Sequence, residues 1–407
     1  MKFLAQEGTS MPGKKHLAVF VAAFSVILGP LFTTTLLFAA SKEKVLYSFG
    51  PSGVLGPTAG LSFDTSGNLY STTYMGGDLN EGTVWELMHK TGGGWTEKIL
   101  YDFGSDGGGP AAGVIVDAAG NLYGTTSRGG IHAAGTVFEL THKRDEKVLY
   151  SFCSLSSCPD GCSPLGGLLR DKAGNLNGTT ASCGTSNQGT VFQLSKSGTE
   201  TVLHSFAGGS SDGAFPAYTS LLMDAKGNLY GVTTQGGASN EGVVYKLSKS
   251  GKLTVLHSFA GGSTDGCNPD GTLAMDKHGN LYGTTTGCGS SDDGIVWKVS
   301  QKGSETVLHN FTGGSDGADP NGGVVIDMKG NLYGTTVNGG AYSAGTVFEV
   351  TPKAGGGATE KLLHSFGKGS DGTFPYAGLI FDASGNLYGT TYEGGAYGGG
   401  TAFEVTP

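Results

Sequence analysis

Residues 117–139 read DAAGNLYGTTSRGGIHAAGTVFE, and versions of this stretch recur along the chain after residue 43. The most regular part is Asp-x-x-Gly-Asn-Leu, usually followed by Tyr. Its copies begin at Asp64, Asp117, Asp171, Asp224, Asp276, Asp327 and Asp382, at spacings of 53, 54, 53, 52, 51 and 55 residues. Seven copies at a nearly constant period indicate a tandem-repeat architecture in which each copy is one structural unit.

Each repeat contains four segments that are typical of β-strands. Towards the end of the chain they are residues 361–366, 377–382, 386–392 and 400–406, short runs rich in aliphatic, aromatic and β-branched side chains. Four short strands in each repeat of about 50 residues predict an all-β fold, a seven-bladed β-propeller. The alternative is a solenoid, which would normally have shorter coils and dedicated caps.

The two ends of the repeat region are incomplete in complementary ways. Residues 45–49 form a strand of the fourth type without the first three, and the chain stops at Pro407 after a strand of the third type. We therefore expect the N-terminal strand to complete the last blade, which closes the ring and leaves no free sheet edge at the seam.

Residues 1–40 differ from the rest of the chain. Lys14, Lys15 and His16 precede a largely apolar run at 17–40, a pattern typical of a signal peptide. Because the run is long enough to cross a bilayer, an uncleaved N-terminal membrane anchor is the alternative. We expect the propeller to span residues 41–407, outside the cytoplasm in an extracellular, periplasmic or cell-surface location, with membrane contact only through an uncleaved N-terminal segment.

The charge of the chain excludes one class of partner. Charged residues make up 14% of the sequence and the net charge is −9, without a long basic stripe. Nucleic-acid binding requires positive charge to neutralise phosphates, so we expect no nucleic-acid partner.

Two recurring Asp motifs have a structural and a functional interpretation. The Asp-x-x-Gly-Asn element lacks the alternating ligands and distal Glu of a calcium loop, which favours a hairpin turn. A second Asp, usually followed by Gly, precedes the first strand of six repeats. A turn is again favoured, and the alternative is a ring of carboxylates that holds a cation. These residues are Asp106, Asp160, Asp212, Asp265, Asp316 and Asp371.

Four His residues occupy one position of the fourth strand, where other repeats have Tyr. They are His204, His257, His309 and His364. Exchange of His with Tyr favours packing with a polar tip over metal ligation. The sequence also has no nucleophile elbow, phosphate loop or metal-ligand spacing. We therefore predict no metal, no cofactor and no catalytic residues.

The repeat resembles that of the bacterial choice-of-anchor tandem repeat proteins named for the Gloeo/Verruco repeat. The residues that carry the resemblance are Asp-x-x-Gly-Asn-Leu-Tyr-Gly-Thr-Thr, then Gly-Gly, then Gly-Thr-Val-Phe-Glu, as at 117–139. The resemblance covers residues 45–407 and implies an exported or surface-attached protein without an established reaction. Because no anchor follows Pro407, any attachment is expected at the N-terminus.

Two classes of function remain open. The nearly symmetric repeats favour an exported binding or scaffold module for a glycan, peptide or protein, expected to be a monomer. The alternative is a propeller enzyme, a lyase or hydrolase that acts on extracellular polysaccharide at the axis.

We expect any ligand site on the face that carries the loops between the second and third strands. The position eleven residues after each key Asp does not repeat, unlike the structural positions around it. Tolerance at loop tips is the alternative explanation. The candidate ligand-binding residues are Tyr74, Arg128, His132, Gln235, Asn338, Tyr392 and Glu393.

The six cysteines fall into a regular pattern. Cys162 and Cys183 lie nine residues before and twelve after their key Asp, and Cys267 and Cys288 occupy the same two places in another repeat. Both places lie at one end of a hairpin. The pattern predicts disulfides Cys162–Cys183 and Cys267–Cys288 in an exported protein. Cys153 and Cys158 then pair with each other or stay free.

The third repeat departs from the pattern at two positions together. Arg170 precedes Asp171 where other repeats have an apolar residue, and Asn177 replaces the usual Tyr. Folding the hairpin about its turn predicts that Arg170 and Asn177 are cross-strand neighbours, either as local compensation or as a functional notch.

Overall fold

The computed structural model describes residues 42–50, 53–104, 107–354 and 356–407. The chain divides into two units, Met1–Ala39 and Ala40–Pro407, and all described residues belong to the second. The signal peptide or anchor predicted at residues 1–40 and the turn residue Asp106 lie outside the described residues. No helix within the described ranges is both long and apolar enough to cross a membrane.

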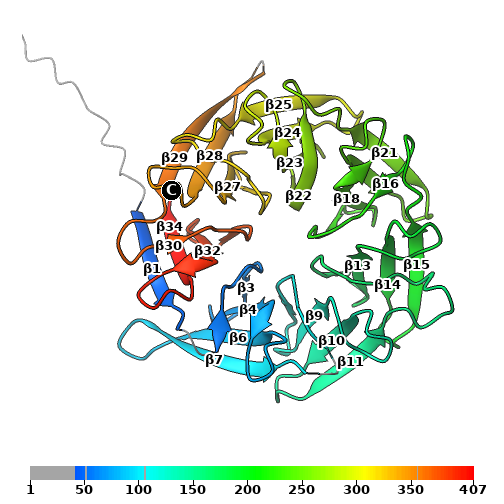
Figure 1. Ribbon diagram of the computed structural model, residues 1–407, viewed down its shortest axis with the longest axis horizontal. Coiled ribbons are helices and arrows are strands. Elements are labelled where there is room, and N and C mark those ends of the chain that lie inside the picture. Colours follow the sequence, from blue (N-terminus) through cyan, green and yellow to red (C-terminus); the bar gives the residue numbers. More distant parts are fainter. Residues whose placement is uncertain (1–41, 51–52, 105–106, 355) are drawn as a thin grey trace, which may run out of the picture. The chain divides into compact units, whose positions relative to one another are not determined.

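The described residues form seven four-stranded antiparallel sheets that surround a common axis (Figure 1). In each sheet the strands follow one another outward from the axis, and each outermost strand leads into the next blade. This arrangement is the seven-bladed β-propeller that the repeat predicts.

Blades are numbered 1 to 7 along the chain, and their strands are given from the axis outward. Blade 1 contains β3 (Ser62–Phe63), β4 (Leu69–Thr73), β6 (Thr83–His89) and β7 (Trp95–Asp102). Blade 2 contains β8 (Ile115–Val116), β9 (Leu122–Thr126), β10 (Thr136–Leu140) and β11 (Glu146–Ser151). Blade 3 contains β12 (Leu169–Arg170), β13 (Leu176–Thr180), β14 (Thr190–Leu194) and β15 (Glu200–Ser205). Blade 4 contains β17 (Leu222–Met223), β18 (Leu229–Thr233), β20 (Val243–Leu247) and β21 (Leu253–Ser258). Blade 5 contains β22 (Gly266–Met275), β23 (Leu281–Cys288), β24 (Ile295–Val299) and β25 (Glu305–Asn310). Blade 6 contains β26 (Val324–Ile326), β27 (Leu332–Thr336), β28 (Thr346–Pro352) and β29 (Ala358–Ser365). Blade 7 contains β31 (Ile380–Phe381), β32 (Leu387–Thr391), β34 (Thr401–Thr406) and β1 (Lys42–Ser48).

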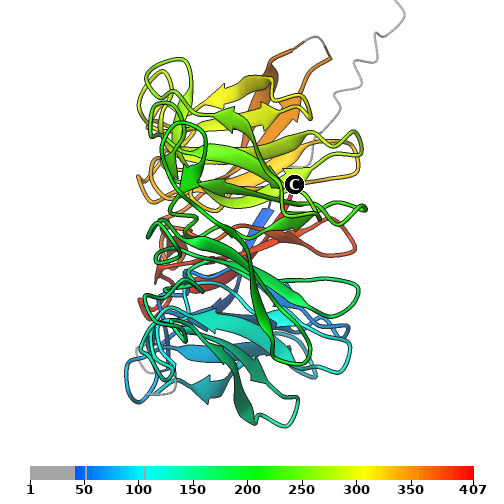
Figure 2. The same cartoon turned by 90° about the vertical axis from the view of Figure 1, so that its right-hand side faces the viewer.

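The ring has two faces, which Figure 2 shows edge-on. The loop face carries the loops between second and third strands and the loops that lead into the innermost strands. The turn face carries the Asp-x-x-Gly turns. On the loop face short ladders join the two kinds of loop, and three of them form two-stranded sheets. These are β2 (Val54–Leu55) with β5 (Met75–Gly76), β16 (Gly213–Ala214) with β19 (Gln235–Gly236), and β30 (Gly372–Thr373) with β33 (Glu393–Gly394).

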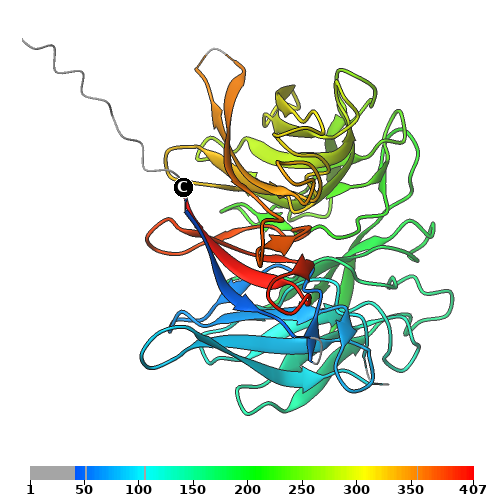
Figure 3. The same cartoon turned by 60° about the vertical axis from the view of Figure 1, so that its left-hand side comes forward.

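The N-terminal strand closes the ring, as the incomplete repeats predict. Strand β1 pairs with β34 in antiparallel fashion, with Lys42 opposite Thr406 and Ser48 opposite Thr401. Figure 3 shows β1 beside β34 at the edge of blade 7. The adjoining Phe49 is fully buried, so the seam contributes to the core as well as to the ladder.

The core lies between neighbouring blades. Each third strand carries one large aromatic ring that meets, at a steep angle, a Phe that follows the fourth strand of the preceding blade. The seven ring centroid distances lie between 4.9 and 5.6 Å. The pairs are Phe49–Trp85, Phe103–Phe138, Phe152–Phe192, Phe206–Tyr245, Phe259–Trp297, Phe311–Phe348 and Phe366–Phe403. Such contacts stabilise beyond the area that they bury.

One glycine of the repeat leaves the space that this aromatic ring occupies. A Cβ atom added at Gly124 in β9 would lie 2.6 Å from Cζ of Phe138 in the neighbouring strand β10. The equivalent residue is Gly in six blades and Ser71 in blade 1. The Gly of the Leu-Tyr-Gly-Thr-Thr motif therefore reflects packing inside each blade.

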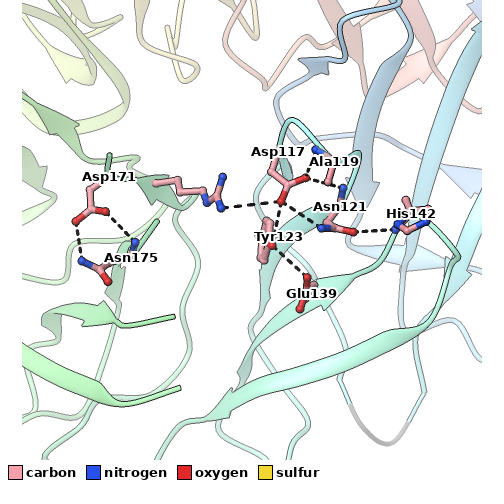
Figure 4. A network of polar contacts seen from close by, with 9 residues as sticks. Asp117, Ala119, Asn121, Tyr123, Glu139, His142, Asp171 and Asn175 are labelled. Carbon is pink, nitrogen blue, oxygen red and sulfur yellow. Dashed lines mark hydrogen bonds and ion pairs between the residues drawn. The ribbon is translucent and has the colours of Figure 1, made fainter. Parts of the chain in front are cut away.

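The Asp-x-x-Gly-Asn element forms the predicted turn (Figure 4). One carboxylate oxygen of Asp117 accepts hydrogen bonds from the backbone N–H groups of Ala119 and Asn121, both at 2.9 Å. The other accepts from the Asn121 amide and the Tyr123 hydroxyl, both at 3.2 Å. Burial alone would raise the pKa of Asp117, but the hydrogen bonds outweigh burial and hold it below its ordinary value.

Candidate functional site

The second recurring Asp and the recurring His or Tyr are hydrogen-bonding or ionic partners, a contact that the sequence alone did not predict. In blade 4 the carboxylate of Asp212 lies 3.1 Å from Nε2 of His204 and accepts the N–H groups of Ala207 and Gly213. The same pairing occurs at Tyr150–Asp160, His257–Asp265, His309–Asp316 and His364–Asp371. Each of these carboxylates binds the outermost strand of the preceding blade. They are therefore distributed around the rim as turn residues and do not gather about one cation.

A third group joins one such pair at the boundary of blades 6 and 7. Ligand-type atoms of Glu43, His364 and Asp371 lie within 4.8 Å of one another. Burial, followed by the charge of Asp371, raises the pKa of Glu43 to about 7, although His364 opposes this shift. The His364–Asp371 distance is 2.8 Å, so a cation could bind here only by replacing that hydrogen bond.

The disulfides follow the predicted pattern. Cys162 is bonded to Cys183 and Cys267 to Cys288, each pair with its Cα atoms 5.4 Å apart. Cys153 and Cys158, for which the sequence left two possibilities, are bonded to each other. In blade 3 the bridge joins the loop before the innermost strand to the segment after the second strand, and in blade 5 it joins β22 to the last residue of β23. Both bridges therefore restrain the loop face.

The expected pairing of Arg170 with Asn177 is wrong. Arg170 is opposite Leu176, and Asn177 is opposite Leu169. The turn is closed by the backbone hydrogen bond from Asp171 N–H to the carbonyl of residue 175, which makes Arg170 and Leu176 the first cross-strand pair. The sequence prediction misplaced the register by one residue, and such a slip puts a side chain on the opposite face of the strand.

Both unusual residues of blade 3 have other partners. The Arg170 guanidinium lies 4.0 Å from the Asp117 carboxylate and 5.6 Å from the centre of the Tyr123 ring, both in blade 2. Asn177 is fully buried and accepts a hydrogen bond of 3.0 Å from Gln193. A hollow of about 520 Å³ lies beside Arg170 on the turn face, with polar and charged walls.

A cavity of about 810 Å³ lies at the axis. Every blade contributes to its wall the residue six positions before the key Asp, and these residues are chemically diverse. They are Thr58, Ala111, Leu165, Tyr218, Asp270, Asn321 and Tyr376. The cavity is within the size range of small-ligand sites. This position was not predicted from the sequence, although it varies between repeats just as the predicted loop position does.

Three of the seven predicted ligand-binding residues line this cavity: Tyr74, Tyr392 and Glu393. Arg128 is at its rim, with its guanidinium 5.1 Å from the centre of the Tyr74 ring and 3.1 Å from the Glu81 carboxylate. The other three, His132, Gln235 and Asn338, are exposed residues that do not belong to the wall. The structure therefore brings together only part of the predicted set.

Four tyrosines give the cavity an aromatic wall: Tyr74, Tyr218, Tyr376 and Tyr392. The rings of Tyr376 and Tyr392 meet edge to face with centroids 5.7 Å apart. Tyr218 is 54% exposed and has a φ of +51°, which is uncommon for a residue other than glycine. Blade 4 has one extra residue between Pro216 and Asp224 compared with the other blades, and Tyr218 lies in that longer segment. Backbone strain of this kind is frequent at functional sites.

Asp270 is the most perturbed ionisable group of the cavity. It is only 8% exposed, and one of its carboxylate oxygens accepts a hydrogen bond of 2.7 Å from the N–H of Gly271. Burial raises the pKa of Asp270 to about 7, which the Gly271 hydrogen bond only partly offsets. Burial also raises the pKa of Tyr218, with smaller contributions from Tyr74 and Asp270. Asp270 can therefore exchange a proton near neutral pH.

Comparisons with known proteins agree with this fold. The family model described as the Gloeobacter/Verrucomicrobia repeat matches residues 19–219, 157–326 and 276–407. No curated protein has a matching sequence.

Solved structures with a similar fold have different functions. The extracellular domain of a provisionally named one component system from B. thetaiotaomicron has a TM-score of 0.54 at 11% identity, over 89% of this chain and 39% of that one. An ancestral GH74 enzyme has a TM-score of 0.53 at 13% identity, over 88% of this chain and 51% of that one. A protein from Bacteroides uniformis ATCC 8492, provisionally identified as a 6-phosphogluconolactonase, has a TM-score of 0.51 at 15% identity, over 82% and 89%. At these identities the similarity is one of fold alone.

Proposed function

The chain belongs to the Gloeobacter/Verrucomicrobia repeat family, and from this premise we propose that it is an exported binding module that holds part of a glycan, peptide or protein in its axial cavity. The observation that carries the proposal is the composition of the cavity wall. Positions that build the blades repeat seven times, whereas the wall position six residues before the key Asp takes six different residue types. Diversity at this position is expected if the wall is adapted to a ligand of low symmetry.

Two further features support an exported module. Three disulfides are typical of proteins that fold outside the cytoplasm. The net charge of −9 disfavours a nucleic-acid partner. On this proposal residues 1–40 direct export and are cleaved or retained as an anchor.

The test is a screen of immobilised glycans and peptides with purified residues 41–407. We expect at least one ligand to bind to the wild type and to lose most of its affinity in the Tyr218→Ala/Tyr392→Ala variant, because aromatic faces supply much of the contact area in such sites. Tyr342→Ala is the matched control, since Tyr342 is 50% exposed and does not line the cavity. Binding that survives the double substitution would place the ligand elsewhere.

The second candidate is a polysaccharide lyase or hydrolase, and Asp270 is the observation that favours it. A carboxyl group with a pKa near 7 suits general acid or base catalysis at neutral pH. Glycoside hydrolases use two carboxyl groups, and Glu393 is a second one in the same wall. Product analysis during the ligand screen tests this candidate: new reducing ends that disappear in Asp270→Asn would establish an enzyme, and intact glycans would exclude turnover of those tested.

A further inference from the structure

We propose that the axial cavity selects an amino sugar, whose ammonium group binds at Asp270 while its ring rests against the tyrosines. This inference rests on the proposed function, because it names the ligand class of the same cavity. The charges of the cavity wall favour a cationic ligand. The described residues that line the cavity include two carboxylates, Asp270 and Glu393, and none of them is Lys, Arg or His. Such a wall attracts cations and repels acidic sugars and phosphorylated ligands.

Asp270 supplies the specific contact. More than nine-tenths of this residue is buried, and only Gly271 donates a described hydrogen bond to its carboxylate. At the same wall position the adjacent blades 4 and 6 contribute Tyr218 and Asn321, neither of which carries a positive charge. Buried carboxylates are normally paired with a cation, and the protein provides none in the wall. A ligand that brings its own ammonium group would complete the site.

The fold does not require a carboxylate at this position. The six equivalent residues are uncharged in the other blades, and the next blade has Asn321, which is close in shape to Asp. The substitution Asp270→Asn is therefore compatible with the repeat, and it removes only the charge.

The tyrosines of the wall also favour a cationic ligand. The face of a Tyr ring attracts cations, and the Arg128 guanidinium already lies over the Tyr74 ring at 5.1 Å. Tyr218 is close enough for Asp270 and Tyr74 to influence its hydroxyl. Tyr218 and Asp270 occupy the same wall position in the adjacent blades 4 and 5, so an ammonium group bound at Asp270 would lie on the side of the cavity that carries Tyr218.

The rest of the wall favours a sugar over a lysine side chain. Hydrogen-bonding groups of Thr58, Asn321, Ser220 and Thr272 are distributed around the cavity, and several tyrosine hydroxyls accompany them. A pyranose has hydroxyl groups on all sides and a flat apolar face for stacking. A lysine side chain is thin, so it would leave much of a cavity of about 810 Å³ and most of these polar groups without contacts.

The experiment is calorimetric titration of residues 41–407 with four probes at pH 7.5. They are chitosan tetrasaccharide, its fully N-acetylated counterpart, cellotetraose, and a terminally blocked peptide that contains one lysine. We expect chitosan tetrasaccharide to bind about tenfold or more tightly than the acetylated form, because a charge-assisted hydrogen bond and a cation–π contact are lost on acetylation. In Asp270→Asn this preference should disappear, and in Tyr342→Ala it should remain.

Each other outcome overturns the inference. Equal or tighter binding of the acetylated tetrasaccharide or of cellotetraose, sensitive to Tyr218→Ala/Tyr392→Ala, would leave the binding module intact and remove the preference for an amine. Binding of the lysine peptide alone would replace the amino sugar by a peptide. A preference for chitosan that persists in Asp270→Asn would assign it to surface charge, and no binding by any probe would exclude an amino-sugar site.

Discussion

At the scale of single residues, the buried location of Asp270 in the cavity wall lowers the stability of the fold but suits the binding of a ligand. Its pKa rises from 3.8 to about 7 because burial disfavours the charged form. The protonated form is therefore the one that the folded chain tolerates best. Residues of this kind are frequently retained for function, because a neutral side chain would be more stable at the same place.

Asp270→Asn should change how stability depends on pH. The contribution of the protonated carboxyl is fully present below about pH 4 and is lost as the pH rises through about 7, since the folded-state pKa is raised. The Asn variant lacks this loss, so its melting temperature should exceed that of the wild type by an increasing margin between pH 4 and pH 8. Glu393→Gln, at an exposed carboxyl group of the same wall, is the control. A margin that stays constant with pH would contradict the prediction.

The glycine that faces the third-strand aromatic ring predicts a second effect at this scale. Gly124→Ala places a methyl group 2.6 Å from Phe138, and overpacking of this kind destabilises by about 1–3 kcal/mol. Gly60→Ala is the matched control, because an added Cβ there meets no atom within 4 Å. Denaturant unfolding followed by fluorescence measures both variants. Equal midpoints would show that blade 2 absorbs the extra carbon without strain.

The contacts of single residues could be predicted from the sequence where the same position could be compared across several repeats. The two longer disulfides were predicted correctly because Cys occurs at both of two places in blades 3 and 5 and at neither place in the other blades. The Arg170–Asn177 contact failed because register depends on which backbone groups close the turn, and one residue decides it. Asp270 was not predicted because its burial and raised pKa arise from chain segments distant in sequence.

At the scale of elements, disulfides and the seam strand restrain parts that the ladder alone holds weakly. The innermost strands in blades 1 to 4 are only two residues long, and so is that of blade 7. The loops that lead into these short strands are held by short ladders and tight turns and, in blade 3, by a covalent bridge.

Removal of one bridge should destabilise the chain measurably. Cys162→Ser/Cys183→Ser opens a loop with a sequence separation of 21, and a bridge of this length contributes roughly 3 kcal/mol. Cys153→Ser/Cys158→Ser, with a separation of 5, should cost less, because a shorter loop restrains the unfolded chain less. Thermal unfolding compares the two variants. Peptide mapping without reductant should recover the three pairs, and a Cys162–Cys267 linkage would refute the assignment.

Deletion of the seam strand should have a larger effect than its length suggests. Residues 45–49 include the buried Leu46 and Phe49, and without them β34 becomes a free edge. We expect the melting temperature to fall by many degrees and the truncated chain to associate through the exposed edge, which light scattering detects. Deletion of the terminal Pro407, which follows β34, is the control. A truncated chain that melts like the wild type would contradict closure by β1.

At the scale of the whole molecule, similar contacts between neighbouring blades recur around the ring. The effects of their ionisable groups on the stability of the fold therefore add up. In blades 3, 5 and 7 the outermost strand places a Glu near the pair formed by the entering-loop Asp of that blade and the His or Tyr of the preceding blade. Burial, and then a neighbouring Asp, raises the pKa to about 7 at Glu43, Glu200 and Glu305. The fold and its closure were predictable from period and strand count, whereas these boundary contacts join adjacent repeats and are invisible within one.

These boundary carboxyls predict a pH profile for the whole ring. Their contribution to stability is present below about pH 4.5 and is lost as the pH rises through about 7, because their folded-state pKa values are raised. The melting temperature should therefore fall between pH 5 and pH 8. The variant with Gln at all three positions should show a flatter profile, and Leu253 at the same strand position of blade 4 shows that a neutral residue is accommodated. An unchanged slope in the triple variant would assign the pH dependence to other groups.

The seam between β1 and β34 has a consequence for the order in which the molecule assembles. Residue 42 is synthesised long before its partner, residue 406, so β1 has no β34 to pair with until the strands of the intervening blades have been made. An unpaired strand is a site of aggregation, and charged residues are the usual protection. Lys42, Glu43 and Lys44 provide such charges at the start of β1, and Lys44 finally lies 3.7 Å from Glu404. The charged residues that oppose aggregation of the unpaired β1 thus become part of the closed ring.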